Sequence, residues 1–253
     1  NGYDTDNNLI DFVIQSTINP QNSSSPKEPP PAIQTGIGVA YVLPQIVKAD
    51  TSVQLTIVLR GVSAATITTV RFAKHPVFDW SHASPAVSAS NGGQPLLRET
   101  KDSVVVGGLA ISAADSVQIR LSGLAAPDST LKVTFRLETG AGTDSTSLVT
   151  PLPAFVLYGN PRAIAVAKVN DMQGIPLNLQ KPVTVRGIVT VAKEFGGPAY
   201  IQDVSGGLAV YDVPFEDAVK IGDEVTITGT VTQYNGLTEL ANVTLHKIHS
   251  SGN

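Results

Sequence analysis

Apolar and polar residues alternate along much of this chain in short runs. The alternation is regular at residues 53–57 and 131–137, which predicts strands with one buried face and one solvent-facing face. Seven such runs, rich in β-branched residues and separated by Gly, Ser, Asp and Pro, lie between residues 36 and 158. Short strands at this spacing are typical of an antiparallel sandwich. We expect that sandwich over residues 36–160, with residues 78–96 as a long surface loop.

The second half of the chain contains five further strand-like runs. A short helical turn is expected at residues 215–221, and Asn235-Gly236 is a strong signal for a tight hairpin turn. Gly187 and Gly229 interrupt two long runs, at points where a curled strand must bend. Five strands in this layout are typical of a small OB-type barrel over residues 161–253. The five runs are residues 183–193, 199–204, 208–212, 224–234 and 237–248.

Residues 1–35 combine one β-prone run with a linker. The run spans residues 9–15, and the Ser- and Pro-rich stretch after it favours extended polyproline geometry at residues 29–31. An isolated strand has unpaired backbone N–H and C=O groups, which must find a sheet edge, water or a neighbour. Donation to an adjacent subunit would build an end-to-end assembly, whereas the alternative is closure on its own domain. The residues of this candidate assembly strand are Leu9, Ile10, Phe12, Val13 and Ile14.

Composition narrows the classes of protein to which the chain can belong. Hydrophobic residues make up 42% of the chain, which is too many for a disordered protein. The absence of cysteine excludes a disulfide framework, a zinc ribbon and a thiol nucleophile. No apolar run approaches the roughly 18 residues of a membrane span. A net charge of −4, with 15% charged residues, provides no overall attraction to nucleic acid or to an anionic membrane.

Three parts of the chain resemble modules of secreted bacterial proteins. OB-fold modules, including those attached to extracellular nucleases, are similar to VRGIVTVAKEFGGPAYIQDVSGGLAVYD and IGDEVTITGTVTQYNGLTEL. Ig-like modules of bacterial surface proteins are similar to GIGVAYVLPQIVKADTSVQLTIVLRG and LSGLAAPDSTLKVTFRLET. The end of a lamin-tail-type domain resembles DTDNNLIDFVIQSTINPQNSSSPKEPP.

This resemblance implies a piece of a larger, multi-module protein that is extracellular or lies on a bacterial cell surface. The expected architecture is all-β: an extended N-terminal segment at 1–35, an Ig-like antiparallel β-sandwich at 36–160 and a five-stranded OB-like barrel at 161–253. The missing initiator methionine and missing signal peptide lead us to expect an internal or processed start. The resemblance implies no catalytic centre.

An acidic cluster near the N-terminus is the main metal candidate. Its alternating oxygen ligands are of the kind that Ca²⁺ prefers, although the glycine and the final bidentate Glu of an EF-hand loop are missing. The alternative is a solvated polar turn before a strand. No other cofactor is expected. The candidate ligands are Asp4, Asp6, Asn8 and Asp11.

The histidines are weaker candidates for a functional site. His75, Asp79 and His82 are close enough in sequence to hold a transition metal, but an exposed loop is the simpler interpretation. His246 and His249 differ by three positions on one strand, so we expect them on opposite faces. The sequence contains no Gly-x-Ser-x-Gly elbow and no P-loop. We therefore expect no catalytic residues and no enzymatic activity.

Nucleic-acid binding is the more specific hypothesis for the barrel, since OB-folds combine stacking aromatics with basic grooves. The charge opposes it: from residue 181 onward there are five Lys and Arg against eight Asp and Glu, and the cations are dispersed. The tyrosines could equally be ordinary barrel residues. The candidate ligand-binding residues are Phe195, Tyr200, Tyr211 and Tyr234 for stacking, and Arg186 and Lys193 for phosphate.

Two kinds of short motif suggest covalent modification. Asn22 and Asn242 fit the N-glycosylation pattern. Four Asp-Ser tripeptides resemble an O-glycosylation signal of exported bacterial proteins, although Asp-Ser also simply forms turns. Their serines are Ser103, Ser116, Ser129 and Ser145.

The sequence favours a non-catalytic structural or adhesive β-module protein, and its N-terminal strand is a candidate for self-assembly. Its expected partners are other copies of itself or another surface protein. The alternative is a nucleic-acid-binding accessory region of a secreted nuclease, which the charge disfavours. The sequence leaves open the identity of the ligand, the oligomeric state, glycosylation and the remainder of the parent protein.

Overall fold

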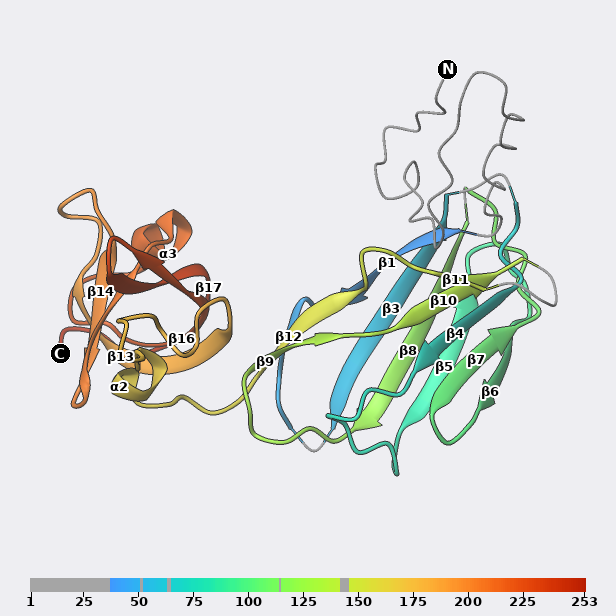
Figure 1. Ribbon diagram of the computed structural model, residues 1–253, viewed down its shortest axis with the longest axis horizontal. Coiled ribbons are helices and arrows are strands. Elements are labelled where there is room, and N and C mark those ends of the chain that lie inside the picture. The colour runs from blue at the N-terminus through green and yellow to red at the C-terminus, as the bar shows by residue number, and fades with distance from the viewer. Residues whose placement is uncertain (1–36, 51, 63–64, 114, 142–145) are drawn as a thin grey trace, which may run out of the picture. The chain divides into compact units, whose positions relative to one another are not determined.

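The computed structural model describes residues 37–253, apart from residues 51, 63–64, 114 and 142–145. The described chain is almost all β, which confirms the expected fold class. It contains a β-sandwich followed by a closed five-stranded barrel (Figure 1). The sandwich was expected to be antiparallel, and its strands pair in this way except for residues 46–48 and 156–158, which pair in parallel. The candidate assembly strand at residues 9–14 and the candidate calcium ligands at residues 4–11 lie outside the described residues. None of the helices in the described part of the chain is long and apolar enough to cross a membrane.

Three sheets make up the sandwich. The first has the order β1 (Gly38–Leu43), β3 (Val53–Gly61), β8 (Ser116–Leu124) and β5 (Ser84–Ala89). The second has the order β11 (Thr146–Leu148), β10 (Leu137–Gly140), β4 (Thr69–Ala73), β7 (Ser103–Gly107) and β6 (Leu96–Glu99). A small third sheet joins β2 (Ile46–Lys48), β12 (Ala154–Tyr158) and β9 (Leu131–Thr134).

Alternating apolar residues of the sandwich strands meet in one core. On β3 the side chains of Leu55, Ile57 and Leu59 are buried, and they share this core with Phe72 of β4. Aromatic rings fill its centre: the centroids of Phe72 and Phe135 are 6.1 Å apart with the rings nearly perpendicular. Edge-to-face ring contacts of this kind add to the free energy gained from burial. The period-2 pattern in the sequence therefore corresponds to the buried face of each strand.

The expected loop at residues 78–96 was wrong in part, because β5 lies inside it. The segment SPAVSA of β5 is poor in β-branched residues, so local propensity does not mark it as a strand. It forms a strand because its backbone pairs antiparallel with β8, from Ser84–Ser122 to Ala89–Val117. β5 is the last strand of its sheet, where Pro85 can be accommodated.

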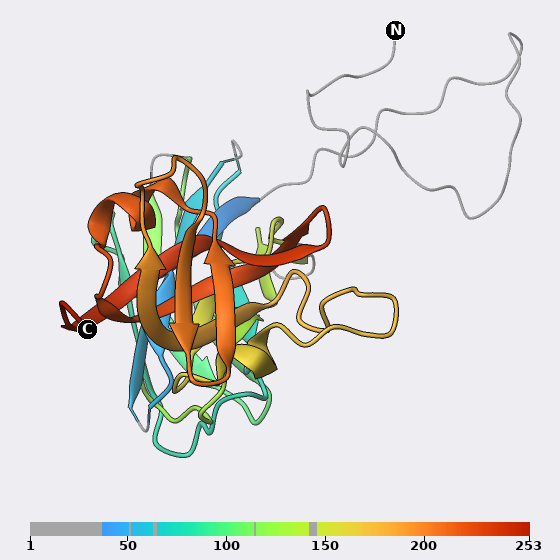
Figure 2. The same ribbon diagram turned by 90° about the vertical axis from the view of Figure 1, so that its left-hand side faces the viewer.

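The barrel has the five strands expected from the sequence. Their order is β13 (Pro182–Val191), β14 (Ala199–Asp203), β15 (Gly206–Val210), β17 (Leu237–Ser250) and β16 (Glu224–Tyr234), closed by pairing of β16 with β13 (Figure 2). β15 and β17 pair in parallel, whereas all other neighbours are antiparallel. A short helix, α2 (Ile164–Ala167), precedes the barrel, and α3 (Val213–Ala218) connects β15 to β16. This connectivity is that of an OB-like barrel.

Glycine allows the close approaches that the curled strands require. A Cβ at Gly187 would lie 2.9 Å from the carbonyl oxygen of Gln202 on the neighbouring strand. A Cβ at Gly229 would lie 2.9 Å from a methyl group of Val243, next to a shift in the β16–β17 register. The expected hairpin turn is also confirmed, with positive φ at both Asn235 and Gly236.

Candidate ligand-binding face of the barrel

The outer surface of β13, β14 and β15 forms a continuous face, which we call the barrel face. Along β14 the side chains of Ala199 and Ile201 are buried in the barrel core, whereas Tyr200 and Gln202 are exposed. Gln202 pairs with Gly207 of β15, and Tyr200 pairs with Ala209. Small residues therefore lie beside Tyr200 on β15. They leave space above the sheet on that side.

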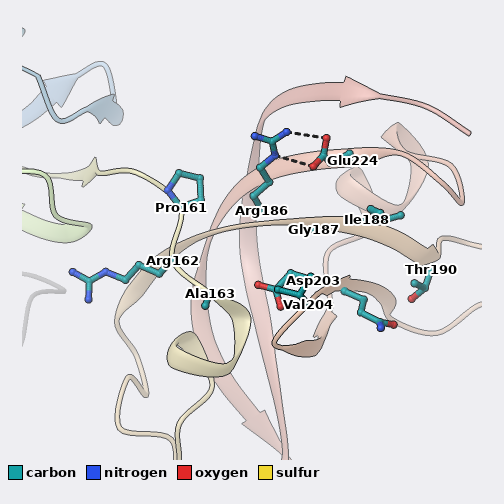
Figure 3. Close-up of a pocket in the computed structure, with 11 residues that line it drawn as sticks. Pro161, Arg162, Ala163, Arg186, Gly187, Ile188, Thr190, Asp203, Val204 and Glu224 are labelled. Carbon is teal, nitrogen blue, oxygen red and sulfur yellow. Dashed lines mark hydrogen bonds and ion pairs between the residues drawn. The ribbon is translucent and has the colours of Figure 1, made fainter. Parts of the chain in front are cut away.

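One groove, which we call the Arg186 groove, lies over β13 and the end of β14 (Figure 3). Its volume is about 830 Å³, within the usual range of ligand sites. Arg186 and Glu224 form a two-pronged ion pair on its wall, with Nε to Oε1 at 3.0 Å and Nη2 to Oε2 at 2.8 Å. Its less polar lining is formed by Pro161, Ala163, Gly187, Ile188 and Val204.

The carboxylates of the Arg186 groove are already engaged. The hydrogen bond from Arg186 lowers the pKa of Glu224 and raises that of Arg186. Asp203 accepts hydrogen bonds from the backbone N–H groups of Ile164, Ser205 and Gly206, at 2.9, 2.7 and 3.1 Å. Burial works to raise the pKa of Asp203, but these hydrogen bonds and that of the Ser205 hydroxyl lower it overall. Both groups therefore stay ionised and organise the barrel.

A second groove, which we call the Tyr200 groove, lies where β15 approaches the β16–β17 hairpin. Its volume is about 280 Å³. Lys168 donates from Nζ to the carbonyl oxygen of Gly207 at 2.7 Å, and the Thr238 hydroxyl donates to Oδ1 of Asn170 at 3.3 Å. The groove thus joins an aromatic side chain to several hydrogen-bonding groups. Its lining includes Lys168, Asn170, Tyr200, Gly207, Leu237 and Thr238.

The structure brings only some of the predicted ligand-binding residues together. Tyr200 lines the Tyr200 groove, and Arg186 lines the other groove. Phe195 is highly exposed on the β13–β14 loop, Tyr211 is exposed just after β15, and Tyr234 is exposed beside the hairpin turn. Figure 2 shows the hairpin at the end of the long β16 and β17 strands.

The two cations predicted to bind phosphate are both paired with carboxylates. Arg186 is paired with Glu224, and Lys193 lies 3.1 Å from Asp217 of α3. A phosphate would have to compete with these partners, which weakens the case for backbone contacts to nucleic acid.

Sequence reasoning missed Lys168, Asn170, Leu237 and Thr238 as groove residues. They come from the segment after α2 and from the start of β17. No local pattern marks them, because their proximity depends on how the barrel closes.

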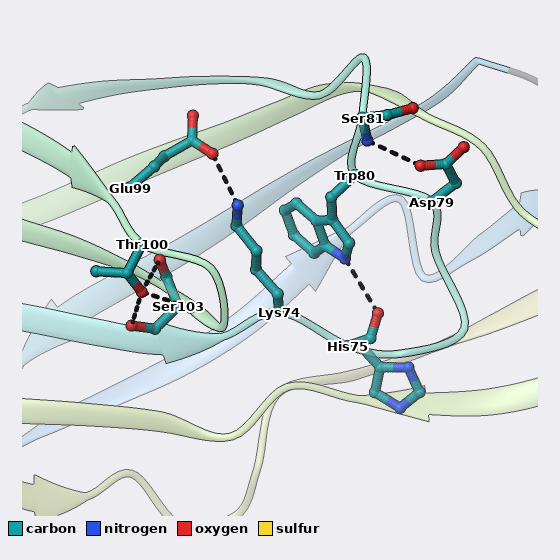
Figure 4. A network of polar contacts seen from close by, with 8 residues as sticks. All are labelled: Lys74, His75, Asp79, Trp80, Ser81, Glu99, Thr100 and Ser103. Atoms are coloured by element: carbon teal, nitrogen blue, oxygen red, sulfur yellow. Dashed lines mark hydrogen bonds and ion pairs between the residues drawn. The ribbon is translucent and has the colours of Figure 1, made fainter.

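The histidines of the sandwich do not form a metal site. His75 accepts a hydrogen bond at Nδ1 from the backbone N–H of Val77, and its carbonyl oxygen accepts one from the Trp80 indole at 3.1 Å (Figure 4). Oδ1 of Asp79 accepts from the backbone N–H of Ser81 at 2.8 Å. No group of three metal-binding side chains occurs among the residues that the structure describes.

The expected separation of His246 and His249 was wrong. Nε2 of His246 is 2.8 Å from the Thr228 hydroxyl, and Nε2 of His249 is 2.8 Å from the Thr226 hydroxyl. Thr226 and Thr228 are two apart on β16, so both histidines meet the same face of that strand. A shift in the β16–β17 register between them changes the alternation along β17. Burial lowers the pKa of both imidazoles.

The candidate modification sites differ in access. Ser103 is buried, and its hydroxyl lies 2.9 Å from that of Thr100, so a glycan there would require local opening (Figure 4). Ser116 and Ser129 are partly buried. Asn242 is exposed. Asn22 and Ser145 lie outside the described residues.

Comparison with known proteins finds one related stretch of sequence. No protein-family model matches the chain. Endonuclease YhcR of Bacillus subtilis (strain 168) is 34% identical over 86 residues, which cover 32% of this chain and 7% of that protein. The chain therefore spans a small fraction of this curated relative, and the match does not transfer the activity of the whole nuclease.

Solved structures give remote likenesses. The sixth cohesin of scaffoldin B from Acetivibrio cellulolyticus, solved with a dockerin, is 13% identical, with 49% of this chain and 99% of that chain covered and a TM-score of 0.31. A non-cellulosomal cohesin from Archaeoglobus fulgidus is 10% identical, with 50% and 93% covered and a TM-score of 0.32. Similarities this low carry no functional argument. The chain is a β-sandwich and an OB-like barrel, with a partial sequence likeness to a bacterial nuclease.

Proposed function

We propose that this chain is a non-catalytic, adhesive region of a larger extracellular or cell-surface protein, and that the barrel face binds its ligand. The observation that carries the proposal is the Tyr200 groove. In OB-folds, the face of the second and third strands, with the loops beside it, is the usual binding surface. Here those strands are β14 and β15, and the flanking segments bear Phe195 and Tyr234.

The chemistry of the barrel face favours an uncharged or weakly charged ligand. Exposed rings supply apolar contact, and the groups around Tyr200 supply hydrogen bonds. The ion pairs of Arg186 and Lys193 remove two cations that could otherwise attract an anion. Adhesion by stacking and hydrogen bonding fits this surface better than attraction by charge.

The state of the carboxylates supports a non-catalytic role for the grooves. A general base must be free to take a proton, and catalytic carboxyl groups usually have a raised pKa. In the Arg186 groove, Asp203 and Glu224 have lowered pKa values and are held by hydrogen bonds. They are suited to hold the barrel together.

Nucleic-acid binding by an accessory region of a secreted nuclease is the second candidate. It is favoured by the sequence match to a stretch of an endonuclease and by the exposed rings near the barrel face. Stacking of bases on aromatic side chains tolerates any sequence. The paired cations argue against tight binding.

A pair of tyrosine variants tests the proposal. Tyr200→Ala is compared with Tyr41→Ala on β1, because both tyrosines are 36% exposed. The full chain and both variants are titrated with uncharged oligosaccharides, extracellular-matrix proteins and single-stranded DNA. We expect Tyr200→Ala to weaken binding of an uncharged ligand about tenfold, on the scale of one lost stacking contact, and Tyr41→Ala to leave it unchanged. Equal affinities of the two variants would refute the role of the groove.

Salt separates the two candidate functions. Binding of DNA through phosphates weakens steeply as salt rises, whereas stacking and hydrogen bonding to an uncharged ligand do not. Binding of DNA alone, lost both in Tyr200→Ala and at high salt, would replace the adhesive function with the nucleic-acid function.

We further propose that residues 9–14 pair with a sheet edge of a neighbouring copy. In the described part of the chain β1 pairs only with β3, and an added strand could pair with its other edge. If deletion of residues 1–35 leaves the mass distribution in solution unchanged, strand donation is wrong.

A further inference from the structure

Between α2 and β13 the chain forms a short projecting segment, residues 169–179, which we call the lobe. Its two arms are joined by backbone hydrogen bonds from Asp171 to Ile175 at 2.8 Å and from Leu177 to Val169 at 2.9 Å. Oδ1 of Asp171 also accepts the N–H groups of Gln173 and Ile175, at 2.9 and 2.8 Å. The lobe therefore has a defined conformation, with its turn closed by the Asp171 carboxylate.

Side chains of the barrel hold the lobe in place. Nε2 of Gln233 on β16 donates to the carbonyl oxygen of Gly174 at 2.6 Å, at the tip of the lobe. Nζ of Lys181 donates to the carbonyl oxygen of Leu177 at 3.2 Å. Figure 2 shows the lobe as the gold segment that projects beside the β16–β17 hairpin. Little conformational entropy remains to be lost when this segment binds a partner.

The lobe exposes an unusual amount of apolar surface. Met172 at its turn is 97% exposed, and it is the only methionine of the chain. A group of exposed apolar side chains on one projection is typical of an interaction site. Methionine is well suited to such a site because its flexible thioether adapts to irregular surfaces. The other exposed apolar side chains of the lobe are Val169, Ile175, Leu177 and Leu179.

The same barrel carries a recess that matches the lobe in chemistry. The Arg186 groove, at about 830 Å³, has room for a few side chains, and much of its lining is apolar. Arg162 lies on its rim. Asp171 is the only charged residue of the lobe, and its charge is opposite to that of Arg162. Of the other charged groups of the groove, Arg186 and Glu224 pair with each other, and Asp203 accepts hydrogen bonds from neighbouring N–H groups. The lobe contains no Lys or Arg, so it lacks the cations that attach proteins to anionic membranes.

We propose that the lobe of one copy docks into the Arg186 groove of a second copy. Within one copy the two surfaces are at opposite ends of β16: Gln233 holds the lobe tip, and Glu224 lines the groove. Gln233 and Glu224 are nine positions apart on β16, so the lobe tip and the groove lie towards opposite ends of this strand. Because the two contacting surfaces differ, the contact repeats from copy to copy and builds a ring or an open chain.

The experiment uses the full chain and two variants that each remove one surface. Met172→Lys places a charge on the lobe, and Val204→Lys places one at the groove, where Val204 is fully exposed and so is not needed for folding. Leu96→Lys, at a 73% exposed position on β6, is the matched control. Sedimentation velocity is recorded at rising protein concentration, up to about 500 µM, because small interfaces bind weakly.

We expect Met172→Lys and Val204→Lys to form smaller oligomers than the unchanged chain and Leu96→Lys, because any assembly that remains in these two variants would come from residues 9–14. An equimolar mixture of Met172→Lys and Val204→Lys should form larger oligomers than either variant alone, since each variant retains the surface that the other lacks. A monomeric unchanged chain, or a mixture whose oligomers are no larger than those of either variant alone, would overturn the proposal. So would oligomers of Met172→Lys as large as those of the unchanged chain, the result expected if the N-terminal strand alone drives assembly. Ligand binding by Tyr200 is measured separately and does not depend on this outcome.

Discussion

Several charged side chains of the barrel form ion pairs or hydrogen bonds with neighbouring residues. The Arg186–Glu224 pair spans β13 and β16, and Asp203 joins the start of α2 to the turn between β14 and β15. Each was visible in the sequence only as an isolated charge. The pairing of Arg186 with Glu224 is one reason why the candidate cations do not form a basic surface.

The ion pair leads to a prediction about acid stability. Arg186 lowers the pKa of Glu224 below its value in the unfolded chain, so the pair stabilises the fold above the unfolded pKa. That stabilisation is lost as the pH falls through the lowered folded pKa. Glu224→Gln should therefore lower the urea midpoint at pH 7 and have a smaller effect at pH 2.5. Asp102→Asn, at an exposed acidic position on the sandwich, serves as the control. An equal loss at both pH values would show that Glu224 acts by packing and not by charge.

At the scale of elements, single residues at strand bends and helix ends decide how the barrel closes. β13 curls because Gly187 lets the backbone of β14 approach, and α3 begins where Asp212 caps it. The first was predicted from the sequence, as a glycine within a strand pattern. The second was not, since the helical turn was expected at residues 215–221 and α3 spans Val213–Ala218.

Substitution of Gly187 tests the close approach. Gly187→Ala should lower the free energy of unfolding by about 1–3 kcal/mol, because the added methyl group meets the backbone of Gln202. Gly197→Ala is the matched control, since a Cβ there meets no atom within 4 Å. Chemical denaturation of both variants measures the difference. A Gly187→Ala variant as stable as Gly197→Ala would mean that the strands separate at little cost.

The cap of α3 provides a second test at this scale. Oδ1 of Asp212 accepts from the N–H of Phe215 at 3.0 Å, and Oδ2 accepts from the N–H of Val243 on β17 at 2.9 Å. Asp212→Ala removes both acceptors and should cost about 1–2 kcal/mol or slightly more. Asp212→Asn keeps one acceptor, so urea denaturation should place it between Asp212→Ala and the unchanged chain. If Asp212→Asn is as unstable as Asp212→Ala, the second contact carries the effect.

At the scale of the whole molecule, the buried side chains divide into two cores. The larger core belongs to the sandwich and the smaller to the barrel, and they share no buried residue. We therefore expect a substitution in one core to leave the packing of the other core intact.

Matched core variants test this independence. Leu137 and Ile227 are both fully buried, one in each core. Leu137→Ala and Ile227→Ala should each cost about 2–5 kcal/mol. Hydrogen–deuterium exchange followed by mass spectrometry should show lost protection in sandwich peptides for the first variant and in barrel peptides for the second. Loss of protection in both sets of peptides for either variant would show that the two cores unfold together.

The local pattern of apolar, polar and turn-forming residues was sufficient to predict most of the strands and the hairpin turn. Period-2 alternation marks the strands because it records which side of each strand is buried, and glycine and asparagine mark turns through their backbone freedom. The five barrel strands and the Asn235-Gly236 hairpin follow from these signals. The strand β5 does not, because it is stabilised by pairing with β8 and not by its own residues.

The sequence by itself determined the all-β class, the five strands of the barrel and the excess of acidic over basic residues from residue 181 onward. Only the tertiary structure decided which residues share a groove, which cations are paired, and that Met172 stands on a rigid, exposed lobe. The reason is physical: burial along a strand repeats with a local period, whereas a groove or an ion pair joins residues that are distant in the chain. Such contacts exist only after the barrel has closed, and no local period encodes them.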